Sequence, residues 1–151
     1  MAAHEFELST ASIALTGGAA TTVLQVVAAA NIRVRILAFG VAFNGATSTS
    51  VPALVEVVRQ STAGTTSALT PTKKDDSIAE TLQSTARHTA TVEPTTGDTL
   101  KAVNVPTYMG RYEWHAPTRE RAIICGGGDR VGIRINAPAN VSVVAWMECE
   151  E

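Results

Sequence analysis

Three side chains in the second half of the sequence are of types that bind metal ions: His88, Glu113 and His115. Glu113 and His115 are two residues apart, so on a β-strand they would project to one face and could offer two ligands. A zinc site needs three or four ligands, and the chain has no H-x-H or C-x-x-C pair to supply the rest. We therefore expect a hydrogen-bonded or exposed pair and no cofactor, and a small metal-dependent enzyme is the weakest of three hypotheses.

Hydroxyl and glycine motifs do not predict catalysis either. A serine nucleophile needs a base and an orienting acid beside it, and the sequence contains no G-x-S-x-G motif. The run Gly126-Gly127-Gly128 lacks the Lys-Ser/Thr of a phosphate-binding loop, and no helix is expected after it. These glycines predict a flexible connection between strands, and we expect no enzymatic activity.

The best candidate binding surface is the aromatic group Tyr108, Tyr112 and Trp114. Tyr112 and Trp114 project to the same face of a predicted strand, next to Arg111. Aromatic platforms bind sugars, and Tyr, Trp and Arg are also enriched in protein–protein hot spots. For Trp114, packing in the core with a cation–π contact is the alternative. Trp146, in the last predicted strand, is expected in the core or at a subunit contact.

Two arginines, Arg33 and Arg35, lie on one face of another predicted strand. They are expected to form a solvated basic rim or to contact an acidic patch, such as the Glu148–Glu151 segment of a neighbouring copy. The net charge is −2 and the pI is near 5.9. Because nucleic-acid-binding domains usually carry a basic patch and a high pI, nucleic acid is not an expected partner.

These arginines begin the most informative segment of the chain, Asn31–Asn44. Side chains of a strand alternate between two faces, and from Leu37 onward both faces are uncharged and mostly apolar. An antiparallel strand with one wet face keeps polar residues there, so this strand must be covered on both sides, by its own chain or by another copy. One face is expected deep in the sandwich or at a subunit seam, and it consists of Leu37, Phe39, Val41 and Phe43.

Apolar runs of strand length alternate with turn signals along the whole sequence, which favours an all-β sandwich. We expect a single domain over residues 1–151, of jelly-roll type, with about eight strands. Residues 1–5 are expected to form a flexible N-terminal arm. Residues 61–84, rich in Ser and Thr, are expected to form a long polar loop with one helical turn near Ser77–Gln83.

Targeting signals are not evident in the sequence. The segment MAAHEFELST has no basic region followed by an apolar stretch, so no signal peptide is expected. No run of about 18 apolar residues predicts a membrane span. Without a secretion signal, Cys125 and Cys149 are expected to be reduced and buried.

Three segments together resemble a known family: LQVVAAANIRVRILAFGVAFNG, TARHTATVEPTTGDTL and RYEWHAPTRERAIICGGGDRVGIRINAPANVSVVAWMECEE. In overall texture the chain is similar to small β-sandwich proteins of tailed bacteriophages, in particular capsid decoration proteins, also called cement or auxiliary head proteins. The resemblance implies a jelly roll, often trimeric, that sits on the outer capsid at threefold or quasi-threefold positions and stabilises the expanded shell. It implies no catalytic residues.

The main hypothesis is therefore a non-enzymatic virion protein, made in the host cytoplasm and located on the capsid surface. Its expected partners are copies of itself, as a homotrimer, and the major capsid protein, with no nucleic acid and no membrane. The second hypothesis is a carbohydrate- or receptor-binding module of a phage tail or fibre, which would use Tyr108, Tyr112 and Trp114.

Overall fold

The computed structural model describes residues 3–48 and 50–151. Within them the chain forms thirteen strands and one short 3-10 helix, with no α-helix. The elements are β1 (Glu5–Ser9), β2 (Ile13–Leu15), β3 (Ala20–Val27), β4 (Val34–Phe43), β5 (Ala53–Gln60), β6 (Thr65–Leu69), β7 (Thr72–Lys73), β8 (Thr85–Val92), β9 (Thr96–Val105), β10 (Arg111–His115), the 3-10 helix (Arg119–Arg121), β11 (Ile123–Cys125), β12 (Arg130–Asn136) and β13 (Val141–Glu150).

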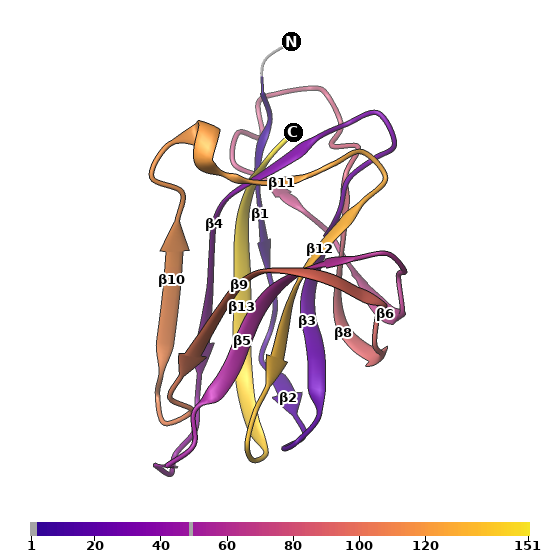
Figure 1. Cartoon of the computed structure of the whole chain (residues 1–151). Coiled ribbons are helices and arrows are strands. Elements are labelled where there is room, and N and C mark those ends of the chain that lie inside the picture. Colours follow the sequence, from indigo (N-terminus) through magenta and orange to yellow (C-terminus); the bar gives the residue numbers. More distant parts are fainter. Residues whose placement is uncertain (1–2, 49) are drawn as a thin grey trace.

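The strands form two antiparallel sheets that pack against each other, so the expected all-β sandwich architecture is confirmed (Figure 1). The first sheet has the order β10-β4-β13-β1-β7, with β11 also paired to β4 and β2 to β13. The second sheet has the order β6-β8-β3-β12-β5-β9. The apolar core lies between the two sheets and consists mainly of Val, Ile, Leu and Phe.

The alternation of side chains along β5 shows how the sequence builds this core. Ala53, Val55 and Val57 point into it and are buried, whereas Leu54 and Glu56 lie on the outer face of the second sheet. One side of the strand is therefore apolar and the other is free to carry polar groups, as expected for an antiparallel sheet.

Strand β4 changes its inward face part of the way along. Ile36 is in the core, and so are Phe39, Val41 and Phe43, although Ile36 and Phe39 are three residues apart. The pairing of β4 with β13 shifts at this point, so that Leu37 is an extra residue opposite β13. A β-bulge of this kind reverses the alternation. A place for Leu37 in the core is therefore wrong, because it is half-buried outside the core, whereas Phe39, Val41 and Phe43 are confirmed as buried. The other expected place for Leu37, a subunit seam, stays a prediction.

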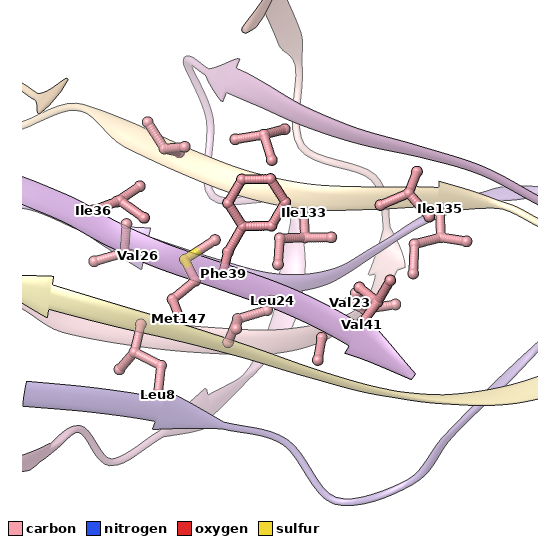
Figure 2. Packing of buried hydrophobic residues seen from close by; sticks show 14 of the residues in the cluster. Leu8, Val23, Leu24, Val26, Ile36, Phe39, Val41, Ile133, Ile135 and Met147 are labelled. Carbon is pink, nitrogen blue, oxygen red and sulfur yellow. The ribbon is translucent and has the colours of Figure 1, made fainter. Parts of the chain in front are cut away.

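Phe39 is one of the largest fully buried side chains of the described residues. Figure 2 shows its ring among Leu24 and Ile133 from the second sheet and Met147 from the first. Full burial of a side chain of this size stabilises the fold by about 1.5–3 kcal/mol. The bulge in β4 is therefore what lets Phe39 reach the space between the sheets.

The polar region 61–84 is more ordered than expected, because two strands form within it. β7 adds to the edge of the first sheet, and β6 adds to the edge of the second. These short strands bring the total above the expected number of about eight. The expected helical turn at Ser77–Gln83 is wrong. The Asp75 carboxylate accepts hydrogen bonds from the backbone N–H and the hydroxyl of Ser77, at 3.0 and 2.6 Å, and this stabilises a turn instead.

Residues 4–5 of the expected flexible N-terminal arm are held by the C-terminal end of the chain. The backbone of His4 makes two hydrogen bonds with Glu151, of 2.9 and 3.0 Å, and Glu5 is paired with Glu150 in the sheet. The rest of the expected arm is Ala3, which is exposed, and residues 1–2, which lie outside the described residues.

Candidate interaction surfaces

The outer face of β4 is covered by the same chain. Trp146, on β13, is paired with Gly40, and a Cβ atom built on Gly40 would lie 2.5 Å from the indole ring. The His115 ring, on β10, lies 6.1 Å from the Trp146 ring. Ala38, on the same outer face, is almost fully buried. Trp146 is thus a half-buried cover on the outside of the sheet, and the second face of β4 needs no other subunit at these positions.

The aromatic group splits into two parts. Tyr112 and Trp114 point inward from β10 and pack on Phe39, with ring centroids 6.1 and 5.5 Å away. The Lys101 ammonium, from β9, lies over the Trp114 ring at 5.1 Å. Both rings therefore close the side of the sandwich where β9 and β10 are the edge strands. Tyr108, in the β9–β10 turn, is half exposed and belongs to a different surface.

Of the two arginines, Arg35 finds an acidic partner within the chain. The Arg35 guanidinium lies 2.9 Å from the Glu150 carboxylate. The same carboxylate accepts a hydrogen bond from Arg119 and forms an ion pair with it. The Glu150 side chain is only 3% exposed. Arg33 precedes β4 and is exposed. Arg35 is thus a structural partner of Glu150 on the neighbouring strand, and Glu150 in turn fixes the connection between β10 and β11 to the end of β13 through Arg119.

The other carboxylates near the C-terminus do the same for other segments. Glu148 forms an ion pair of 2.9 Å with Lys74, and this hydrogen bond raises the pKa of the Lys74 ammonium. The Glu151 carboxylate accepts hydrogen bonds from the backbone N–H groups of residues 83–84, at 2.8 and 2.9 Å. Together with Glu150, these side chains hold two separate loops at one end of the sandwich, the β7–β8 connection and the β10–β11 connection.

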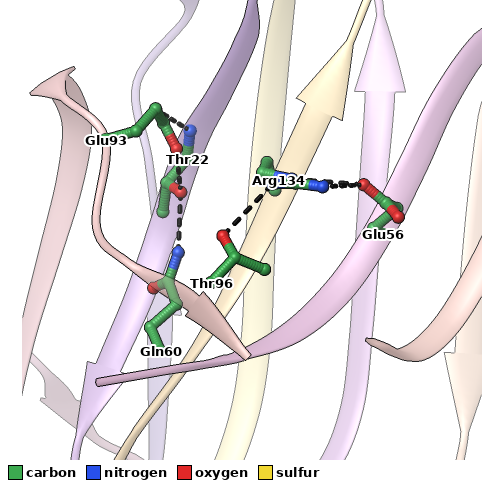
Figure 3. A network of polar contacts seen from close by, with 6 residues as sticks. All are labelled: Thr22, Glu56, Gln60, Glu93, Thr96 and Arg134. Atoms are coloured by element: carbon green, nitrogen blue, oxygen red, sulfur yellow. Dashed lines mark hydrogen bonds and ion pairs between the residues drawn. The ribbon is translucent and has the colours of Figure 1, made fainter. Parts of the chain in front are cut away.

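A buried polar chain crosses the outer face of the second sheet (Figure 3). The Glu93 carboxylate accepts hydrogen bonds from the backbone N–H and the hydroxyl of Thr22, both at 2.7 Å. The Gln60 amide donates to the same hydroxyl at 2.8 Å, and its side chain passes over Gly132, where a Cβ atom would lie 2.5 Å from Gln60 Oε1. These contacts fix the segment between β8 and β9 across the sheet. Sequence reasoning missed them, although a glycine inside a strand is a signal of close approach.

The same face carries an ion pair between neighbouring strands. Arg134 donates to the Glu56 carboxylate at 2.7 and 3.2 Å and to the Thr96 hydroxyl at 3.1 Å (Figure 3). Both charged side chains are mostly shielded from water. Charge-assisted hydrogen bonds of this kind are among the stronger ones, and here they hold the start of β9 against β12 and β5.

The candidate metal ligands do not come together. His88 lies on β8 in the second sheet and contacts Thr89 Oγ1 at 2.9 Å, whereas Glu113 and His115 lie on β10 in the first sheet. Glu113 forms an ion pair with Arg111. Over residues 3–48 and 50–151, no group of three or more His, Cys, Asp or Glu side chains could hold a metal ion.

The two cysteines are free and buried, in agreement with the expectation. They flank β4, because Cys125 pairs with Val34 and Cys149 with Ile36. Burial raises the pKa of both thiols. Raised thiol pKa values mean little thiolate near neutral pH, so neither cysteine has the character of a nucleophile.

One shallow hollow contains charged side chains of both signs. Its volume is about 250 Å³, below the range of about 300–1,000 Å³ that is usual for small-molecule sites. It is lined by Arg59, Gln60, Ser61, Gly97, Asp98, Asp129 and Arg130. Arg59 donates to the Ile124 carbonyl at 3.0 Å, so part of its hydrogen-bonding capacity is used within the fold.

Four turns meet at the end of the sandwich opposite the chain ends (Figure 1). We call this surface the loop end, and it consists of Thr16–Ala19, residues 44–48, residues 50–52, Pro106–Gly110 and Ala137–Asn140. Hydrogen bonds join the turns: Gly17 N–H donates to Asn140 Oδ1 at 2.9 Å, and Gly45 N–H donates to the Thr107 carbonyl at 3.0 Å. Sequence reasoning missed this surface, because its residues are far apart in the chain.

No helix of the described residues is long and apolar enough to cross a bilayer. In comparisons with known proteins, no protein-family model, no curated protein and no solved structure matches this chain.

Proposed function

We propose that this chain is a non-enzymatic structural protein of a phage virion, which binds the outside of the capsid as a homo-oligomer, with three copies expected, and stabilises the shell. The observation that carries the proposal is the strand order. β1-β13-β4-β10 in one sheet faces β3-β12-β5-β9 in the other. Along the chain these eight strands change sheet at every connection except β5 to β9.

This order supports a jelly roll, in which eight antiparallel strands form two four-stranded sheets by two Greek keys. In this interpretation β6, β7 and β8 are an insertion between the fourth and fifth of the eight strands, which are β5 and β9, and β2 and β11 are short additions. Jelly rolls are common in viral capsid domains and also in lectins. Since one fold hosts many functions, the site residues must separate these two uses.

The side chains favour a structural role over a ligand-binding one. Tyr112 and Trp114, two members of the aromatic group, pack against Phe39 rather than forming an open platform. The charged hollow is small. The charged groups that were candidates for binding, Arg35 and Glu150, are used to fix loops. We therefore expect a partner to contact the outer surface of the sandwich rather than a pocket. Binding to an assembled shell stabilises that shell by mass action.

Mixing purified protein with undecorated expanded capsids, followed by imaging, tests the proposal. We expect density at regular positions on the outer surface and a higher temperature of capsid disruption. An oligomer would bind through several weak contacts at once, so it should bind the capsid more tightly than a single copy does. Capsids that stay bare at saturating protein would contradict the proposal.

The carbohydrate- or receptor-binding alternative has a separate test. A glycan array would show binding that is lost in Trp114→Ala but retained in His88→Ala. The absence of glycan binding, together with Trp114 fluorescence typical of a shielded indole, would remove this alternative.

A further inference from the structure

The loop end differs from the rest of the molecule in charge. None of its residues is Asp, Glu, Lys or Arg, and the chain is free of charged residues over 9–32, 36–55, 102–110 and 135–147. The opposite end holds Glu148, Glu150, Glu151 and their cationic partners. The loop end itself is therefore uncharged, and the charged residue that borders it, Arg111, is paired with Glu113 on β10.

Large apolar side chains are exposed on this uncharged surface. Met109 is 74% exposed, Val51 57% and Tyr108 50%. They form one patch, because Ala53 pairs with Val105 and the segments that continue from this pair, 51–52 and 106–109, leave the sheet side by side. Soluble proteins rarely gather exposed apolar groups in this way unless the surface binds a partner.

The patch is held rigidly. Gly45 forms a bridge with Tyr108, and Phe43 N–H donates to the Gly110 carbonyl at 2.8 Å. At Gly110 a Cβ atom would lie 1.7 Å from the Pro106 carbonyl oxygen, so the turn is as tight as glycine permits. Met109, at its tip, has a positive φ of 49°. A surface that is already ordered loses little conformational entropy when it binds.

We propose that copies of this chain associate through the loop end, with Tyr108, Met109 and Val51 at the centre of the contact. The inference rests on the oligomer of the proposed function and names the surface that builds it. Charge selects a second copy as the occupant. Two identical surfaces without ionic groups meet without like-charge repulsion, whereas a partner chosen by electrostatic complementarity would require charges that the loop end lacks.

Composition and size agree with this assignment. The cores of protein interfaces are depleted of charged residues and enriched in Tyr and Met. A stable interface uses about 20–30 residues on each side, and the four turns of the loop end together provide a surface of this order.

Light scattering on the isolated protein, over a dilution series and without capsids, tests the inference. We expect a mass that is a multiple of 15.8 kDa. Met109→Glu places a carboxylate from each copy in the contact and should raise the dissociation constant about a hundredfold or more. Val92→Glu is the matched control: Val92 is also apolar and 60% exposed, but it lies beside β6, so the mass should not change.

A second variant guards against misfolding. Tyr108→Ser with Val51→Ser removes apolar area without adding charge and should also weaken association, while circular dichroism confirms the sheet content of each variant. A monomer at all concentrations overturns the inference, and so does equal dissociation of the Met109→Glu and Val92→Glu variants. Capsid binding is scored separately: a monomer that still decorates capsids refutes the loop-end contact and the oligomer but leaves the proposed capsid binding intact, whereas an oligomer that leaves capsids bare refutes the capsid binding but not the loop-end contact.

Discussion

The indole ring of Trp146 lies on Gly40 and occupies the space that the side chain of any other amino acid at position 40 would need. The ring shields the backbone of the strand that also carries Phe39 on its inner face. One tryptophan and one glycine on neighbouring strands thus complete the first sheet on its outer side, where the sequence offers no polar residue on β4 beyond Arg35.

We predict that Gly40→Ala destabilises the fold by about 1–3 kcal/mol, because the added methyl group overpacks the indole ring. Urea unfolding followed by Trp fluorescence measures the change. Gly97→Ala is the control, since a Cβ atom there meets its nearest neighbour at 3.6 Å. Combining Gly40→Ala with Trp146→Ala should cost less than the sum of the two, and strict additivity would show that the ring and the glycine do not interact.

Glu150→Gln should lower the free energy of unfolding by about 1.5–3 kcal/mol, because charge-assisted hydrogen bonds from Arg35 and Arg119 are lost at a buried carboxylate. Thermal or urea unfolding measures the loss. The matched variant is Glu113→Gln, which breaks the mostly exposed pair with Arg111 and should cost about 1 kcal/mol or less. Similar losses for the two variants would contradict the structural role of Glu150.

The buried thiols predict a pH dependence. An unfolded cysteine has a pKa near 8.5, and burial raises the pKa of Cys125 and Cys149 above the ordinary value in the folded chain. Above about pH 8.5 the unfolded chain loses thiol protons that the folded chain keeps, so stability falls as pH rises, by up to about 1.4 kcal/mol per pH unit for each thiol.

Urea unfolding from neutral pH to about pH 9.5 tests this slope. It should be smaller in Cys149→Ala than in the wild-type chain, whatever the absolute loss of stability. Native protein should also react slowly with a thiol reagent and release two thiols per chain once unfolded. Rapid labelling of the folded protein would show that the thiols are accessible.

Thr22→Val should destabilise the segment between β8 and β9. The substitution removes the hydroxyl that donates to Glu93 and accepts from Gln60, and it leaves both groups without that partner, at a cost of about 1–3 kcal/mol. Hydrogen exchange measured at residues 93–96 should accelerate. Thr85→Val, at an exposed strand end, is the control, and equal exchange in both variants would mean that the polar chain does not hold this segment.

The periodicity of the sequence predicted the all-β sandwich and the burial of Phe39, Val41 and Phe43, because alternation is a local property of a strand. It failed for Leu37, since a bulge depends on the register with β13, which is distant in the sequence. It also missed β6 and β7, whose Ser- and Thr-rich residues gain their pairing from β8 and β1.

The candidate sites show the same division. Packing of Trp114 in the core with a cation over its ring was one of two interpretations, and Lys101 provides that cation from another strand. For Arg35 the alternatives were a solvated basic rim and an acidic patch such as that of a neighbouring copy, and the acidic partner is Glu150 of the same chain. The residue types indicated which chemistry was available, and only the pairing of distant strands determined which groups meet.

Strand β13 is near the end of the chain but lies inside the first sheet, between β4 and β1. During synthesis, β1 and β4 leave the ribosome long before the strand that joins them. The first sheet can therefore close only after residue 150 has been made, and until then the edges of β1 and β4 that pair with β13 lack their hydrogen-bonding partners. Such long-range pairing slows folding, so the nascent chain carries unpaired strand edges, which can pair with other chains, until β13 has been made.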